Sequence, residues 1–187
     1  MLSEKLKEFT QHNHQLLEKK LVMKIKLVNN VQDYARLLQL FYGFFGGLEL
    51  AIDSKINPLF LPDYATRRKS AALAIDLVKM QTTLPVRATS IALPNINNHF
   101  DAMGALYVVE GSTLGGNFIA QMLTKQAPAL KEFSFFIGYG NKTQHMWQLF
   151  KQSLDEPLEY AQAQMVIEGA NDTFLHFSNW FDQHYLS

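Results

Sequence analysis

The residues best placed for chemistry are a histidine, a carboxylate and a lysine that would share one face of a helix. His14 and Glu18 are four residues apart, and Lys7 lies two turns before His14, about 10 Å along a helix axis. A histidine is a common metal ligand when a neighbouring carboxylate holds its second ring nitrogen, so this spacing is compatible with a metal ligand. Lys7 could then reach an acidic group on the rim of the bound molecule. The alternative is an exposed helix with an ordinary histidine–glutamate pair, and the competing His12 would point roughly 160° away from this face.

A glycine-rich stretch from Gly111 to Gly116 interrupts an apolar segment that otherwise has helical spacing. Each glycine inside a helix costs about 1 kcal/mol relative to alanine. Gly111 and Gly115 are four residues apart, so together they would leave a strip of bare backbone on one face, where a loosened turn can bend and free its carbonyl groups. A broad planar ligand could press against this strip. The alternative is close packing of two helices through small residues.

Composition bounds the class of protein. The chain has 187 residues, of which 48% are hydrophobic and 18% charged, which suffices to bury about 70% of the unfolded surface. The formal net charge is zero, so nucleic-acid and anionic-membrane binding have no electrostatic support. The absence of cysteine excludes disulfides and thiolate chemistry and suits a reducing cytosol. We find neither a secretory signal nor a membrane span in the sequence, and we expect a cytoplasmic protein.

The elements that must position these residues are helices. Apolar residues recur at helical spacing in most of the chain, period-two alternation is nowhere sustained, and no linker or repeat divides it. We therefore predict an all-α, single-domain helical bundle covering residues 1–187. The expected helices are 3–28, 31–56, 64–81, 100–125, 143–154 and 156–183, with irregular segments at 82–98 and 128–141.

Other types of active site find little support in the sequence. No Glu-x-x-His or Asp-x-x-His pair occurs, which argues against a di-iron carboxylate bundle. Motifs for a nucleophile elbow, a phosphate-binding loop or a dinucleotide fold are also missing. We interpret the remaining histidines as structural or solvated: His99, His145, His176 and His184.

Two segments resemble the signatures of a known enzyme family. Residues 6–18, which contain His14, are similar to the proximal-helix signature of heme oxygenases, in which a histidine binds the heme iron. Residues 107–116, YVVEGSTLGG, closely resemble the distal-helix signature of bacterial, biliverdin-producing heme oxygenases, including those that supply bacteriophytochromes. Further matches follow in the same order along the chain at 41–49, 138–140 with 146–150, and 166–170 leading into Phe174.

The resemblance implies that heme lies between the first helix and the glycine-rich helix, as both substrate and prosthetic group. His14 would be the axial iron ligand in its neutral form, which disfavours the early O–O cleavage of peroxidases. Gly111, Ser112 and Gly115 would lie at the reacting side, where the two glycines let the helix crowd the iron. Freed carbonyls and an ordered water would deliver the proton.

The same resemblance implies a wider set of contacts with heme. Lys7 and Lys151 match positions that hold the heme propionates, and such cations fix the in-plane rotation of heme and hence the carbon that is cut. The implied heme-binding residues are Lys7, His14, Glu18, Tyr107, Gly111, Gly115, Gly116 and Lys151.

The chain departs from its relatives at several of these positions. Ser112 stands where the animal enzymes carry a distal aspartate, and Phe45 aligns with a tyrosine of their distal network. Asn117 and Trp147 replace residues that are basic or amide-bearing in some relatives. The distal water network must therefore be organised differently.

The function implied is the opening of heme to biliverdin, iron and carbon monoxide, using O₂ and an external electron donor such as ferredoxin or a flavin reductase. A photoreceptor that uses biliverdin is a further implied partner. The alternative is a heme-sequestering or heme-delivering protein on the same fold. A thiaminase-type enzyme would need a cysteine that the chain lacks, and a heme-free interaction module is the remaining possibility.

Overall fold

The computed structural model describes residues 1–185, and this part of the chain is helical and contains no strand. The helices are α1 (Leu2–Ile25), α2 (Val31–Asp53), α3 (Ala71–Lys79), α4 (His99–Gln126), α5 (Ser134–Ile137), α6 (Thr143–Leu154) and α7 (Tyr160–Tyr185), with 3-10 turns η1 (Tyr64–Thr66) and η2 (Gly140–Lys142). The prediction of an all-α bundle is confirmed.

Asparagine caps set the starts of two long helices. The Asn30 side chain accepts a hydrogen bond from the Asp33 amide at 2.8 Å and begins α2. The Asn98 side chain accepts from the amides of Phe100 and Asp101 at 2.8 and 3.1 Å and begins α4. These bonds satisfy amides that have no partner inside the helix. Both helices therefore begin within a residue of the predicted positions.

The predicted helix over residues 64–81 is wrong in its first half. The segment forms only the turn η1, and α3 does not begin until Ala71. Between them Arg67 is extended, with φ −73° and ψ 155°. The extended backbone sends the guanidinium groups of Arg67 and Arg68 into the interior, where each donates hydrogen bonds to groups on α4. These tertiary bonds outweigh the local helical preference.

Smaller differences occur at the helix ends. The first helix ends at Ile25 rather than 28, α2 ends at Asp53 rather than 56, and the last helix begins at Tyr160 rather than 156. The segment 128–141, expected to be irregular, contains the single turn α5. Four residues are too few to show a helical period in the sequence.

Aromatic side chains fill the core between α2, α5 and α7. The rings of Phe44 and Phe177 stack at 4.7 Å between centroids, and Phe41 contacts Phe135 and Phe136 edge to face. These contacts place α5 against α2 and so fix the loop that leads into α6.

Two glycines let α4 and α7 approach closely. A Cβ at Gly104 would lie 2.3 Å from the Val166 carbonyl oxygen, and one at Gly169 would lie 2.9 Å from the Asp101 carbonyl oxygen. Side chains at either position would push the helices apart. The close crossing holds the first half of α4 in the centre of the bundle.

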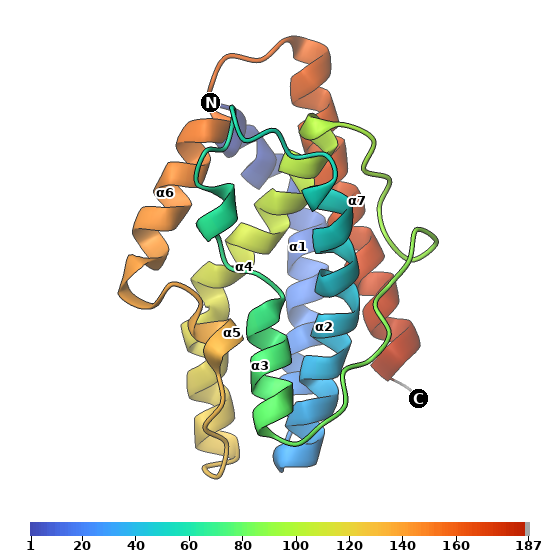
Figure 1. Cartoon of the computed structure of the whole chain (residues 1–187), viewed down its shortest axis with the longest axis vertical. Coiled ribbons are helices and arrows are strands. Elements are labelled where there is room, and N and C mark those ends of the chain that lie inside the picture. The colour runs from blue at the N-terminus through green and yellow to red at the C-terminus, as the bar shows by residue number, and fades with distance from the viewer. Residues whose placement is uncertain (186–187) are drawn as a thin grey trace.

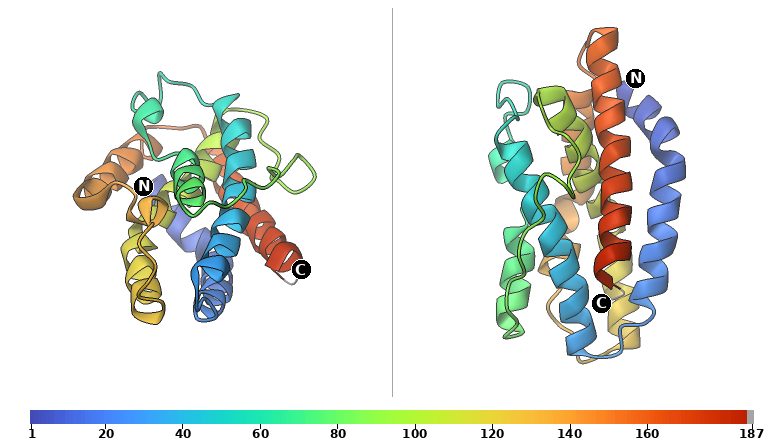
Figure 2. Two further views of the ribbon diagram at one scale, coloured as in Figure 1. Left: turned by 60° about the horizontal axis from the view of Figure 1, so that its bottom comes forward. Right: turned by 90° about the vertical axis from the view of Figure 1, so that its right-hand side faces the viewer.

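The arrangement of α1, α4 and α6 determines the surroundings of the glycine stretch. Figure 1 shows that α1 and α4 run in the same direction, away from the N-terminal end, whereas α6 runs back toward it. The right-hand view of Figure 2 shows α7 beside α1. The Asn13 and Asn171 side chains are hydrogen-bonded at 2.9 Å, and Lys20 pairs with Asp182 at 2.5 Å, so α7 holds α1 along much of its length.

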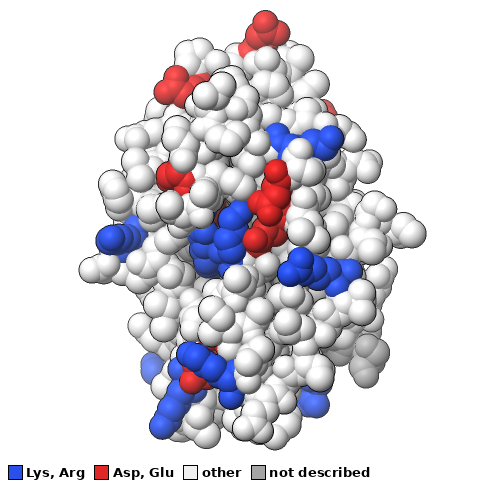
Figure 3. Space-filling model, in the orientation of Figure 1, with Lys and Arg blue, Asp and Glu red and all other residues white. Residues whose placement is uncertain are grey.

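Charged side chains are scattered over the surface. On the face in Figure 3, basic and acidic groups are interspersed among uncharged ones. No helix within residues 1–185 has both the length and the apolar character needed to cross a membrane.

Candidate functional site

The His14 imidazole is exposed on α1 and free to bind a ligand. Its ring lies beside Phe174 of α7, at 5.4 Å between centroids, and no group within residues 1–185 hydrogen-bonds to either ring nitrogen. Lys7 and Glu18 are exposed on the same face of the helix. Of the residues described, Glu18 makes no hydrogen bond to His14, so the carboxylate–histidine contact that the spacing suggests is not formed.

Gly111 and Gly115 present bare backbone on α4. Among the described residues, a Cβ built at Gly115 would meet no atom within 4 Å, and one at Gly111 would meet only the Trp147 ring, at 3.9 Å. Leu114 and Phe118 flank this strip on the same side, and 40% and 63% of their surfaces are exposed. Within residues 1–185 no helix packs against Gly115, so packing between these helices does not account for this glycine.

Gly116 has a different role in the structure. A Cβ there would lie 1.9 Å from the Phe136 carbonyl oxygen on α5. The absence of a side chain thus allows α5 to pack directly on α4, away from the face that Gly111 and Gly115 share. Close packing through a small residue therefore applies to the last glycine of the stretch.

The side chains of Thr10 and Tyr107 approach one another and bring the histidine face and the glycine face together. Thr10 is one turn before His14 on α1, and Tyr107 is one turn before Gly111 on α4. The helices α1 and α4 run in the same direction (Figure 1). His14 therefore lies on the same side of this contact along α1 as the glycines do along α4. Burial raises the pKa of the Tyr107 hydroxyl, so this group stays protonated at neutral pH.

Helix α6 borders the same region with an aromatic ring and a cation. The Trp147 ring lies 5.6 Å from that of Tyr107 and covers Gly111. Lys151 follows one turn later on the same side of α6. Neither Lys7 nor Lys151 forms an ion pair with any residue in the described part of the chain. Within residues 1–185, two lysines without an ion pair thus lie on α1 and α6, the helices that neighbour α4.

The Ser112 side chain points away from the glycine face, toward Arg68. Its hydroxyl donates to the Val109 carbonyl oxygen at 2.7 Å and accepts from Arg68 Nη2 at 2.7 Å. The same Nη2 donates to that carbonyl at 2.8 Å. The Val109 carbonyl oxygen therefore accepts two hydrogen bonds from side chains, and the Glu110 carbonyl oxygen accepts one from the Thr113 hydroxyl at 2.6 Å. Helix α4 remains helical through the stretch, and it changes direction near its middle (Figure 1).

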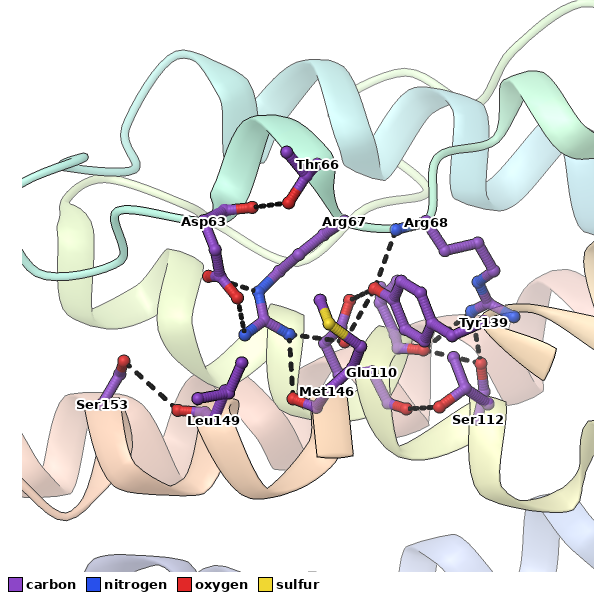
Figure 4. A network of polar contacts seen from close by, with 12 residues as sticks. Asp63, Thr66, Arg67, Arg68, Glu110, Ser112, Tyr139, Met146, Leu149 and Ser153 are labelled. Atoms are coloured by element: carbon purple, nitrogen blue, oxygen red, sulfur yellow. Dashed lines mark hydrogen bonds and ion pairs between the residues drawn. The ribbon is translucent and has the colours of Figure 1, made fainter. Parts of the chain in front are cut away.

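Behind the glycine stretch lies a buried ionic network, drawn in Figure 4. Arg67 donates to Glu110 at 2.7 Å, and both side chains are 1% exposed. Arg67 also pairs with Asp63 at 2.8 Å. The Tyr139 hydroxyl lies 2.9 and 3.0 Å from the two oxygens of Glu110 and accepts from the Arg68 amide at 2.8 Å. The network joins η1, α4 and the loop before η2.

Burial dominates the electrostatics of this network. It raises the pKa of the Glu110 carboxyl, while Arg67, Tyr139 and Arg68 act in the opposite direction. It also lowers the pKa of Arg68 to about 10, so this group stays charged at neutral pH. Burial and Glu110 raise the pKa of Tyr139, which keeps its hydroxyl a proton donor. The network therefore supplies fixed donors to the back of α4.

Sequence reasoning missed this network, although one signal for it was present. Glu110 is the only acidic residue between Asp101 and Glu132, and it lies in an apolar helix. A carboxylate in such a place requires a buried partner. The partners Arg67 and Arg68 are 43 and 42 residues away, so only the fold identifies them.

Taken together, the site can hold a flat, largely apolar molecule that carries a metal and anionic groups. Such a molecule would meet an imidazole on α1, bare backbone on α4 and cations on α1 and α6. No group of three or more histidine or acidic side chains within residues 1–185 could hold a metal ion.

Comparison with known proteins identifies the family. The family model "Heme oxygenase" matches residues 1–183. A heme oxygenase of Xanthomonas campestris is 31% identical over 145 residues, which cover 77% of this chain and 86% of the relative.

Two solved structures are similar in fold. The structure of the NO- and CO-bound heme oxygenase of Neisseria meningitidis superposes with a TM-score of 0.82 at 18% identity, covering 99% of this chain and 92% of the other. That of heme oxygenase-1 from the cyanobacterium Synechocystis in complex with heme superposes with a TM-score of 0.73 at 16% identity, covering 97% and 91%. The chain belongs to the heme oxygenase family and is an enzyme that degrades heme.

Proposed function

We propose that heme binds between α1 and α4, with His14 as the iron ligand and the backbone at Gly111 and Gly115 against its other face. The observation that carries this proposal is the exposed imidazole beside a helix strip without side chains, with nothing within 4 Å of a Cβ at Gly115. A helix tolerates glycines at a cost of about 1 kcal/mol each, and a close ligand offsets that cost.

The residues present fit heme in three respects. His14 has ring nitrogens that make no hydrogen bond in the described chain, as an axial ligand requires. Leu114 and Phe118 are apolar and exposed beside the glycine strip, as suits a porphyrin ring. Lys7 and Lys151 are lysines without acidic partners within residues 1–185, as suits two propionates.

The activity is the opening of heme to biliverdin, Fe²⁺ and carbon monoxide at the expense of O₂ and electrons. Heme supplies the iron for oxygen chemistry, and its own ring is the substrate. Gly111 and Gly115 leave room for the ring and for a small molecule near the iron. Arg68 and Ser112 hold the Val109 carbonyl, so they fix the helical turn before this strip. Trp147 excludes water from the Gly111 end of the site.

The buried network positions α4. Arg67 and Tyr139 hold Glu110, one residue before Gly111, and thereby fix the distance of the bare strip from α6 and η1. Ser112, although implied to act at the reacting side, belongs to this network through Arg68. Its role in our proposal is to hold the helix.

The partners complete the proposal. The reaction consumes electrons, and we propose that an external donor such as ferredoxin or a flavin reductase supplies them. A photoreceptor that takes up biliverdin is a proposed user of the product. A chain without cysteine suits a reducing compartment, and we propose the cytoplasm.

A turnover experiment tests the function. Purified protein is loaded with one equivalent of hemin and given ascorbate in air, with catalase present to exclude degradation by free peroxide. Conversion of the bound heme to a bile pigment, identified by chromatography, is the expected result. A Soret band that ascorbate and ferredoxin both leave unchanged would contradict catalysis and indicate heme sequestration.

A further inference from the structure

One side chain joins the end of α6 to the start of α1. Asp155 accepts from the Ser3 amide at 2.8 Å through Oδ1 and from the Ser3 hydroxyl at 2.7 Å through Oδ2. Its own amide donates to the Lys151 carbonyl oxygen at 2.9 Å and closes the last turn of α6. Met1, at the cap position of α1, has no side-chain oxygen to offer, so Asp155 provides the missing cap from another helix. We call this contact the Ser3–Asp155 clasp.

The clasp lies one helical turn from each of the two unpaired lysines. Lys7 is four residues after Ser3 on α1, and Lys151 is four residues before Asp155 on α6, about 6 Å along each axis. Because α6 runs opposite to α1 (Figure 1), both lysines lie on the same side of the clasp. On the far side of Lys151, Trp147 packs on Tyr107, whose side chain lies near that of Thr10 on α1. The two lysines are thus held between two fixed contacts.

The separation of these lysines matters because of the shape of heme. The porphyrin ring is nearly four-fold symmetric, so an iron ligand and an apolar slot leave its rotation about the iron–histidine axis free. Only the two propionates mark one edge of the ring. Cations at fixed positions therefore select a rotation, and the rotation decides which bridging carbon faces the crowded side of the site.

We infer that Asp155 is a positioning residue that sets the regiospecificity of ring opening. Its bonds to Ser3 fix the separation of Lys7 and Lys151, and this separation selects the in-plane orientation of heme. The inference rests on the proposed contact of both lysines with the propionates. It assigns no contact between Asp155 and heme itself.

The test compares Asp155→Ala and Ser3→Ala with the wild type. Ser3→Ala is the milder variant, because it removes the hydroxyl bond and keeps the amide bond. Asp182→Ala is the matched control, since it also removes an aspartate that joins α1 to another helix, at the Lys20 end. The readouts are the biliverdin isomers after one turnover and the heme methyl resonances in the NMR spectrum of the cyanide complex. A further readout, independent of turnover, is the affinity for metal-free protoporphyrin and for its dimethyl ester.

We expect both clasp variants to change the isomer ratio and the methyl pattern. Asp155→Ala should change the ratio by about fivefold, which corresponds to the roughly 1 kcal/mol that a hydrogen bond contributes. The affinity for free protoporphyrin should fall by a similar factor while that for its dimethyl ester stays unchanged. Asp182→Ala should leave isomers and affinities as in the wild type. Equal effects of Asp155→Ala and Asp182→Ala would overturn the inference, because general loosening of α1 would then suffice.

A double variant separates this inference from the proposed function. If Lys7→Ala with Lys151→Ala changes the isomers and the clasp variants do not, the propionate assignment stands and the role of Asp155 is refuted. If the double variant also leaves the isomers and the protoporphyrin affinity unchanged, the propionate assignment fails, and the inference fails with it.

Discussion

Two adjacent glycines should respond in opposite ways to the same substitution. At Gly115 an added Cβ meets nothing within 4 Å, so Gly115→Ala gains only the helix propensity of alanine, about 1 kcal/mol. At Gly116 the Cβ would lie 1.9 Å from a backbone oxygen of Phe136, and α5 must move to admit it. Overpacking of this kind costs up to about 3 kcal/mol. The helix propensity of alanine offsets about 1 kcal/mol of this cost. Gly116→Ala should therefore lower the free energy of unfolding by about 2 kcal/mol.

The assay is thermal and urea unfolding of the two variants without heme. For a chain of this size, 1 kcal/mol corresponds to about 2–4 °C in Tm. Gly115→Ala should therefore melt about 2–4 °C above the wild type and Gly116→Ala about 4–8 °C below it. Adding hemin should reduce the difference in Tm between Gly115→Ala and the wild type. The new methyl group occupies space that heme needs, so the variant binds hemin more weakly and gains less stability from it.

Two results would contradict this reasoning. If Gly115→Ala destabilises the heme-free protein, another segment covers this face and the strip is not open. If it stabilises the protein equally with and without hemin, the open strip is not where heme binds.

Four further substitutions test the buried network and Lys151. Arg67→Met should lower the free energy of unfolding by about 3–5 kcal/mol, because Glu110 stays buried without its partner. In urea unfolding, adding Glu110→Leu should restore much of this loss. No recovery in the double variant would refute the pairing. Burial raises the pKa of Glu110 above its ordinary 4.5. As the pH rises from 4.5 through the raised pKa, the wild type should therefore lose stability relative to Glu110→Gln. A gain in stability would mean that Arg67 lowers that pKa. Tyr139→Phe should cost about 1–3 kcal/mol and leave hemin affinity unchanged, whereas a large loss of affinity would place Tyr139 in the heme site. Lys151→Ala should weaken hemin binding by about fivefold in titrations and leave the Tm of the heme-free protein unchanged, since Lys151 makes no ion pair within residues 1–185; an unchanged affinity would contradict its role.

The long helices were predictable because their signals are local. The helical period indicates α2 and α4 within a few residues, and Gly111 and Gly115 share a face by spacing alone. The resemblance to heme oxygenases, which rests on residues 6–18 and 107–116, is confirmed by the family model and the Xanthomonas relative.

Features that depend on distant residues could not be predicted from the sequence. The helix expected from residue 64 is interrupted because Arg67 and Arg68 reach α4, and no local pattern encodes that reach. The direction of the Ser112 side chain follows from its position on the helix, but its partner Arg68 does not. The Ser3–Asp155 clasp joins residues 152 positions apart.

The iron–histidine stretching band in the resonance Raman spectrum of the ferrous heme complex most directly tests the central claim that His14 holds the iron. The wild type should show this band, His14→Ala should lack it, and added imidazole should restore it in the variant. His12→Ala, the matched control on the other side of α1, should keep the band. An unchanged band in His14→Ala would show that another group binds the iron and would contradict the placement of heme between α1 and α4.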